Sequence, residues 1–217
     1  MEAERGMDSR LLRVLEHPLL AVHVSALRAV ETEADAFRRH LTAIARLMAY
    51  PVLADLPVEG YALTTPLAGA TGHRLAQVPV LVPVLRAGLG MVEAFLDLVP
   101  DAVVSHLGLY RDHVTKEPVR YYTNFPQGLM SHPVLLLDPM LATGGSAVDA
   151  LTLLKQEGAR DLRLVNVIAA PEGIRRVSAE HPDVTIYAAA VDERLNDEAY
   201  IVPGLGDAGD RQFGTLP

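Results

Sequence analysis

Residues 134–151 read VLLLDPMLATGGSAVDAL and contain, in order, an apolar run, an acidic residue, a turn of small residues and a segment with helical periodicity. An apolar run without polar alternation is typical of a strand that is covered on both faces. The helical segment continues to Gly158, which is placed to cap its carboxyl end. This order of strand, tight turn and helix is the repeating unit of a parallel α/β sheet.

The same alternation continues on both sides of this unit. Further strands are predicted at residues 78–85, 102–110, 162–170 and 184–192, and further helices at 88–99 and 171–181. Before the first strand, residues 32–52 predict an amphipathic helix that ends at Pro51, and residues 61–76 predict a small hairpin or an irregular strand pair around Gly69. The predicted fold class is α/β, with a mostly parallel sheet flanked by helices.

Two segments do not follow this alternation. Residues 111–128 are polar at first and aromatic later, and they are too long for a simple turn, so we expect a protruding arm. Residues 193–217 are rich in glycine and proline, which favours a loop folded over the sheet and not a helix. At 217 residues the chain is expected to form one domain, 1–217, with residues 1 to about 12 as a loose extension.

Composition excludes several classes of function. A net charge of -8 argues against a nucleic-acid-binding protein, which needs a basic surface. The chain contains no cysteine, so thiolate catalysis and sulfur-bound zinc are excluded. Its start does not resemble a signal peptide, and no apolar run approaches the roughly 20 residues of a membrane span. We therefore expect a soluble cytoplasmic protein without a membrane partner.

The turn after Asp138 is the candidate binding site. Ligands of open parallel sheets collect beyond the carboxyl ends of the strands. Thr143, Gly144, Gly145 and Ser146 can direct successive N–H groups and two hydroxyls at one oxyanion, and the helix dipole assists them. Asp138 could accept hydrogen bonds from sugar hydroxyls or help to hold a magnesium-bound ligand. The structural alternative is an ordinary turn in which Ser146 caps the helix and Asp138 is solvated.

Four strings resemble those of the uracil phosphoribosyltransferases. Residues 138–146, DPMLATGGS, closely resemble the loop that binds 5-phospho-α-D-ribose 1-diphosphate, abbreviated PRPP. The strings LRAGLG at 85–90, YR at 110–111 and YIVPGLGDAGD at 200–210 agree with the same family, and the resemblance runs from about His17 to Thr215. It implies the type I phosphoribosyltransferase fold, with an N-terminal helical region, a β-arm at 111–128 and a C-terminal hood at 193–217.

The resemblance also implies roles for individual residues. The PRPP-binding set would be Arg86, Arg111, Asp138, Pro139, Met140, Leu141, Ala142, Thr143, Gly144, Gly145, Ser146 and Asp207. The uracil-binding set would be Ile201, Gly206, Asp207 and Ala208, and the catalytic set would be Arg86, Asp138 and Asp207. For both arginines, guanidinium binding to diphosphate competes with a simpler reading as surface salt bridges.

By the same resemblance, the chain would convert uracil and PRPP to UMP and diphosphate in pyrimidine salvage. Mg²⁺ would be bound to the diphosphate and not held by protein alone, and the assembly would be a homodimer or a higher even homo-oligomer. GTP activates some relatives, and the sequence leaves open whether it activates this chain. Arg120 and the pair Asn124-Phe125 depart from the family pattern in the arm, where interface chemistry could differ.

Two other functions compete with this interpretation. A nucleotide-sensing regulator on the same fold would bind RNA, but it would need a basic face, and this chain is acidic. A dinucleotide enzyme would need a third glycine after Gly88 and Gly90, and that position holds Glu93.

Overall fold

The computed structural model describes residues 11–111 and 118–215 and is built on a sheet that is almost entirely parallel. In spatial order its strands are β1 (Leu12–Val14), β11 (Thr185–Val191), β10 (Asp161–Ala169), β8 (Pro133–Leu137), β4 (Val80–Leu85), β6 (Leu107–Arg111) and β7 (Pro118–Thr123). The short strands β5 (Val103–Val104) and β9 (Met140–Leu141) pair with β4 and β10. Within the described part of this sheet, β6 and β7 are the only strands that pair antiparallel. The predicted α/β class and all five predicted strand regions are confirmed.

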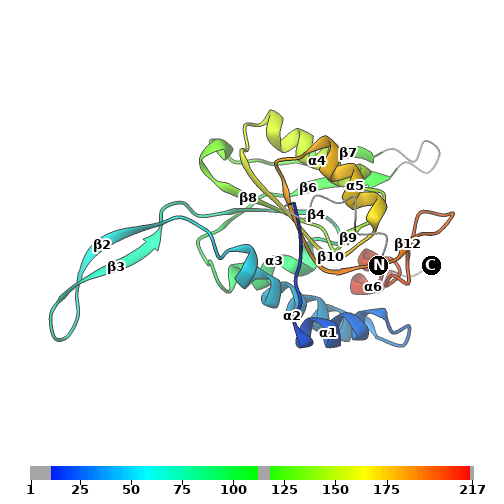
Figure 1. Cartoon of the computed structure of the whole chain (residues 1–217), viewed down its shortest axis with the longest axis horizontal. Helices are drawn as coiled ribbons and strands as arrows, with labels where there is room; N and C mark the ends of the chain where they lie inside the picture. Colours follow the sequence, from blue (N-terminus) through cyan, green and yellow to red (C-terminus); the bar gives the residue numbers. More distant parts are fainter. Residues whose placement is uncertain (1–10, 112–117, 216–217) are drawn as a thin grey trace.

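Helices cover both faces of this sheet (Figure 1). One face packs against α1 (Pro18–Arg28), α2 (Ala34–Val52) and α3 (Leu89–Leu96), and the other packs against α4 (Gly145–Gln156) and α5 (Pro171–Glu180). Along β8, Leu135 and Leu137 belong to the first core while Val134 and Leu136 belong to the second. Successive side chains of a strand point to opposite faces, so an unbroken apolar run supplies both cores.

The predicted helices are confirmed, with small differences at their ends. Residues 32–52 were predicted to be helical, and α2 spans Ala34–Val52. Pro51 lies in the last turn instead of ending the helix, because the Leu53 N–H still donates to the carbonyl of Ala49 at 2.9 Å. Gly158 follows α4 with a φ of +94°, a left-handed conformation that glycine adopts without a Cβ penalty.

The element that extends farthest from the sheet is the hairpin of β2 (Val58–Thr64) and β3 (Gly69–Leu75) (Figure 1). It confirms the strand pair predicted at 61–76. In the region predicted as an arm, Arg111 ends β6 and residues 118–123 form β7, which pairs with β6 at the edge of the sheet. Residues 112–117 lie outside the described residues, as do the side chains of residues 109–120.

The chain joins the sheet earlier than the predicted extension of residues 1 to about 12 implies. Leu12 begins β1, and the carbonyl of Leu11 accepts a hydrogen bond from the N–H of Ile186 at 2.7 Å. Without β1, strand β11 would present an unpaired edge, which folded proteins usually cover. Residues 1–10 lie outside the described part of the chain.

The tail contains a short helix, α6 (Ala208–Phe213), so the prediction of a loop without helix is wrong for these residues. The Asp207 side chain caps α6, because its Oδ1 accepts from the N–H of Asp210 at 2.9 Å. Such a cap stabilises a helix by about 1 kcal/mol, comparable to the cost of Gly209 in a helical position. Among the described helices, none has the length and apolar character that crossing a bilayer requires.

Gly88 lets the turn after β4 approach the end of β8 closely, and this gives a first prediction. A Cβ at Gly88 would lie 2.3 Å from the carbonyl oxygen of Leu137 and 2.7 Å from the nitrogen of Val84. Both are backbone atoms of the sheet, so relief requires the strands to shift. We expect Gly88→Ala to lower the free energy of unfolding by about 2 to 3 kcal/mol in urea denaturation.

The matched control is Gly69→Ala, where no atom lies within 4 Å of the added Cβ and the backbone conformation suits any residue. The free energy of unfolding of this variant should stay within about 0.5 kcal/mol of the original. Equal losses in the two variants would contradict the close-approach explanation.

Candidate active site

The site forms beyond the carboxyl ends of two neighbouring parallel strands in the middle of the sheet. Asp138 follows β8 and Arg86 follows β4, and the two strands pair in parallel with Pro83 opposite Leu137. Carboxyl ends of parallel neighbours meet at the same edge, so residues far apart in sequence come together there.

The loop from Asp138 to Ser146 is held along β10. The N–H of Asp138 donates to the carbonyl of Val165 at 3.1 Å, and the Asn166 side chain donates to the carbonyl of Asp138 at 2.6 Å. The carbonyl of Pro139 then accepts from the N–H of Val167 at 2.9 Å, and β9 pairs with β10. The first half of the predicted binding loop is therefore a hydrogen-bonded extension of the sheet.

The second half of the loop turns into α4. Gly144 has a φ of +78° and precedes the first helical residue, Gly145, while the Thr143 hydroxyl accepts from the N–H of Gly145 at 3.5 Å. Ser146 lies inside the helix and does not cap it, and no side chain caps α4 at Gly144. The start of α4 thus has the composition and the backbone turn of an anion-binding cradle.

Helix α5 packs directly on this loop, a feature that the sequence analysis missed. A Cβ at Gly173 would lie 2.4 Å from the carbonyl oxygen of Ala142, and a Cβ at Gly144 would lie 3.0 Å from the carbonyl oxygen of Gly173. The approach therefore depends on glycine on both sides. The signal in the sequence was a glycine two residues after Pro171, at the start of a helix that follows a strand.

The C-terminal hood is anchored by two arginines that the sequence analysis did not single out. It contains the antiparallel pair β12 (Arg194–Leu195) and β13 (Ile201–Val202). Arg28 of α1 donates to Asp192 and to the carbonyl of Gly204, both at 2.8 Å. Arg211 donates to the carbonyls of Leu205 at 2.8 Å and Ala29 at 2.6 Å. The hood is thereby tied to α1 and to the segment after it.

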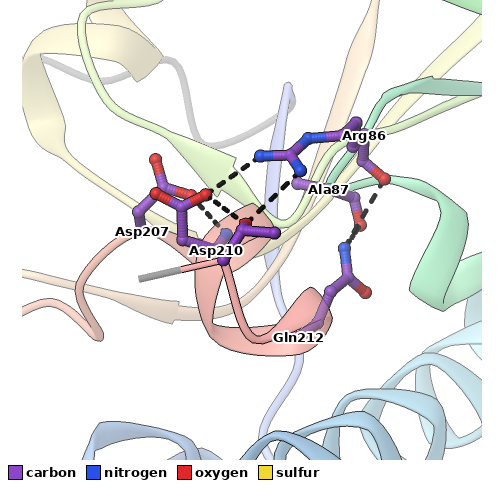
Figure 2. A network of polar contacts seen from close by, with 6 residues as sticks. Arg86, Ala87, Asp207, Asp210 and Gln212 are labelled. Atoms are coloured by element: carbon purple, nitrogen blue, oxygen red, sulfur yellow. Dashed lines mark hydrogen bonds and ion pairs between the residues drawn. The ribbon is translucent and has the colours of Figure 1, made fainter. Parts of the chain in front are cut away.

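Arg86 connects the turn after β4 to the hood, as Figure 2 shows. Its Nη2 lies 2.9 Å from Oδ1 of Asp210, and its side chain is 53% exposed. Gln212 of α6 donates to the carbonyl of Ala87 at 2.9 Å, so the same turn is also held through its backbone. The salt-bridge reading of Arg86 is therefore accurate for the protein alone, but its partner belongs to the candidate site.

The structure places the other predicted residues around the same edge. Arg111 is the last residue of β6 and lies beyond Gly108, which pairs with Leu85. Gly206, with a φ of +76°, and Asp207 are exposed at the end of the hood loop. The buried residues Ile201 and Ala208 contribute their backbone to β13 and to the start of α6.

Comparison with known proteins identifies the family. The uracil phosphoribosyltransferase family model matches residues 14–215. A relative from Symbiobacterium thermophilum, named uracil phosphoribosyltransferase, is 53% identical over 93% of this chain and 97% of its own length. Another of that name, from Finegoldia magna, is 51% identical over the same shares of both chains. This chain belongs to the uracil phosphoribosyltransferase family.

Solved structures agree with this assignment. The AQ2163 protein from Aquifex aeolicus is 38% identical, with a TM-score of 0.89 over 93% of this chain and 97% of that one. A hypoxanthine-guanine phosphoribosyltransferase from Bacillus anthracis has a TM-score of 0.51 at 10% identity over 73% of this chain and 80% of that one, which shows a shared fold only. The predicted fold of the uracil phosphoribosyltransferase family is thereby confirmed.

Within this uracil phosphoribosyltransferase fold, the pKa of the Asp138 carboxyl group is raised above its ordinary value. Burial at the end of β8 raises the pKa of Asp138 from 3.8 to about 7. The Met140 N–H, which donates to its Oδ1 at 3.4 Å, favours the charged form, while the charge of Asp207 raises the pKa further. The two carboxyl groups are thus close enough to interact, although their residues are far apart in the sequence.

This shift predicts a pH-dependent cost to stability. Because folding raises the pKa of Asp138, its contribution favours the folded state most below about pH 4 and is lost as the pH rises through about 7. Asp138→Asn cannot ionise. The free energy of unfolding of this variant, relative to that of the original protein, should therefore increase by on the order of 1 to 3 kcal/mol between pH 5 and pH 8, as measured by urea denaturation.

The control is Asp101→Asn, which changes an exposed carboxylate in the same way. We expect the growth with pH of the difference in free energy of unfolding between variant and original to be larger for Asp138→Asn than for the control. A difference between Asp138→Asn and the original protein that does not grow from pH 5 to pH 8 would show that folding does not raise the pKa of Asp138.

Proposed function

We propose that this chain transfers the 5-phosphoribosyl group of PRPP to N1 of uracil, giving UMP and diphosphate. The observation that carries the proposal is the convergence of the 138–146 loop, Arg86 and the hood at one edge of the sheet, in a chain that belongs to the uracil phosphoribosyltransferase family. Each of these parts has a distinct role in the proposed reaction.

The loop is proposed to bind the ribose 5-phosphate. The N–H groups of residues 143–146 and the hydroxyls of Thr143 and Ser146 supply donors, and the positive end of the α4 dipole favours the anion. Asp138 precedes this cradle and would accept hydrogen bonds from the ribose hydroxyls. The hydrogen bonds of the loop to β10 keep these groups in place before the ligand binds, which lowers the entropy cost of binding.

Arg86 and Arg111 are proposed to bind the diphosphate. A guanidinium offers paired, charged N–H donors that match phosphate oxygens. In the protein alone Arg86 pairs with Asp210, so a diphosphate would have to share this guanidinium or displace the carboxylate. Either event would alter the contact between the turn after β4 and α6, and would couple PRPP binding to the position of the hood.

The hood is proposed to recognise uracil through its backbone. A planar pyrimidine with two carbonyls and two N–H groups requires donors and acceptors in one plane, and backbone groups at Ile201, Gly206 and Ala208 can supply both. Gly206 adopts a φ of +76°, which non-glycine residues seldom reach. Asp207 would then face PRPP from the same loop.

In the reaction itself, the bond from uracil N1 to ribose C1 forms while the bond from C1 to the diphosphate oxygen breaks. The electron pair of the broken bond leaves with the diphosphate, and C1 is inverted through an oxocarbenium-like transition state. The N1 proton of uracil is released, and we assign no residue as its essential acceptor. The contribution of the protein is placement of both substrates and stabilisation of charge, with the hood excluding water from C1.

The site also suits Mg²⁺ that is bound to the diphosphate. The carboxylates of Asp138 and Asp207 are hard oxygen donors, and the charge of Asp207 acts on Asp138. One or two carboxylates together with phosphate oxygens are the usual environment of this ion. When bound, Mg²⁺ would offset the negative charge of the leaving diphosphate.

The other expectations from the family resemblance stay predictions. They are activation by GTP, assembly into a homodimer or a higher even homo-oligomer, and a cytoplasmic location. The alternative of an RNA-binding regulator has no support, because the relatives reported above are named as enzymes and the net charge is -8.

The proposed reaction can be tested directly. We expect the purified chain to form UMP from labelled uracil, PRPP and Mg²⁺, and to lose this activity when EDTA is added in excess. Cytosine, hypoxanthine and orotate, offered separately, should yield product at less than about one hundredth of the uracil rate, because unpaired polar groups in a binding site are costly. Use of another base in place of uracil would overturn the substrate assignment.

The role assignments can be tested by substitution. We expect Arg86→Ala and Asp138→Ala each to reduce kcat/KM for PRPP by about 100-fold or more, since both remove charge stabilisation at the reacting bond. Arg74→Ala is the control, because Arg74 also forms an exposed ion pair, with Glu59, but lies in the β2–β3 hairpin. Near-normal kinetics in both site variants, with circular dichroism unchanged, would refute the assignments.

A further inference from the structure

Arg176 of α5 lies beside the cradle at the start of α4. The position that a Cβ of Gly145 would occupy is 3.3 Å from Nη1 of Arg176 and 3.7 Å from the Thr143 hydroxyl oxygen. The position for a Cβ of Gly144 is 3.3 Å from the Cβ of Arg176. The arginine side chain therefore runs along both glycines, and its guanidinium borders the same small space as the Thr143 hydroxyl.

The geometry of α5 explains this placement. Gly173 lets the first turn of the helix approach Ala142, and residues three positions apart lie on the same face of a helix. Arg176 is therefore on the face that Gly173 presses against the loop. Its neighbour Arg175 is exposed and lies outside this three-residue spacing. Two adjacent residues with the same charge thus differ in their relation to the cradle.

The charges around the site favour a cation at this position. Asp138 and Asp207 bring negative charge to the site, and the guanidinium of Arg86 is paired with Asp210. An incoming phosphate would be opposed by these carboxylates. Arg176 is held by Glu180 at 3.4 Å, and both side chains are about half exposed, at 44% and 51%. An exposed pair of this length is weak, so a phosphate dianion can compete for the guanidinium.

We propose that Arg176 is an additional ligand of the phosphate bound by the 138–146 loop, and that it helps to hold the 5-phosphate of both PRPP and UMP. This inference rests on the proposed function, because it assumes that the loop binds that phosphate. It assigns Arg176 to binding and not to the bond-breaking step, so the substrate affinity depends on it and the turnover number does not.

Each of the two reaction products carries only one of the two phosphate groups of PRPP. The binding of each product can therefore test one end of the site. UMP carries the 5-phosphate without the diphosphate, and free diphosphate lacks the 5-phosphate. We expect Arg176→Gln to raise the Kd of UMP about fivefold to tenfold in isothermal titration calorimetry and to leave the Kd of diphosphate unchanged, because one charge-assisted hydrogen bond at a half-exposed position is lost. In kinetic assays, KM for PRPP should rise while kcat stays within about twofold.

Arg175→Gln is the matched control, since it removes the same charge from the adjacent position of the same helix. It should leave both Kd values unchanged. Equal weakening of UMP binding in the two variants would show that the loss of a positive charge anywhere on α5 is enough. Unchanged UMP binding in Arg176→Gln would show that Arg176 does not contact the 5-phosphate. Weaker binding of both products in Arg176→Gln would show a disturbed site. Each of these results overturns the inference.

The experiment also distinguishes this inference from the proposed function. If the original protein forms UMP and binds it, while Arg176→Gln behaves like the original, only the assignment of Arg176 fails. If the original protein neither forms nor binds UMP, the proposed function fails and the inference fails with it.

Discussion

The backbone pairing between the 138–142 segment and β10 is the constraint on which the rest of the site depends. β8 ends at Leu137, yet the chain continues to bond to β10 through Asp138, Pro139 and the short strand β9. This continuation carries the loop to the start of α4 in a defined direction. It also leaves Asp138 at the carboxyl-terminal end of the strands, on the side of the hood. The main-chain N–H and the carbonyl of Asp138 are both hydrogen-bonded.

Fixing Asp138 in this way has an electrostatic consequence. The carboxyl group lies at the end of a buried strand and is only partly exposed to water, and burial raises its pKa to about 7. Folding therefore works against the charged form of Asp138, the form that would bind a cation in the proposed function. In the proposed function, the bound ligand would offset this cost, since binding sites often carry groups that lower the stability of the free protein.

Because the whole chain is acidic, the binding of an anionic ligand depends on the local arrangement of a few groups. With a net charge of -8, the protein as a whole does not attract a highly anionic substrate, so binding must come from a few oriented groups. The N–H groups at the start of α4 and the guanidinium of Arg86 have this role in the proposed function. Arg86 also pairs with Asp210 of α6, so a ligand that binds Arg86 would act on both the turn after β4 and the hood.

Much of the fold could be predicted because it depends on local pattern. The unbroken apolar runs of β4, β8 and β10 indicated strands covered on both faces, and the spacing within α2 indicated its buried face. The glycines of the 138–146 string marked the turn for the same reason, since a positive φ at Gly144 strongly favours glycine wherever the segment lies. The α6 helix was missed because the Asp207 cap offsets the cost of the glycine in the helix, and the composition of the tail does not reveal that cap.

The sequence by itself determined the strand and helix pattern, the acidic charge and the 138–146 string with its glycine turn, because these follow from residue types within one segment. Only the tertiary structure decided that Arg86 meets Asp210, that Arg28 and Arg211 anchor the hood, and that Arg176 borders the cradle. These contacts join segments whose separation along the chain carries no information about their distance in space. That distance is set by how strands order within the sheet and by how closely helices pack on it.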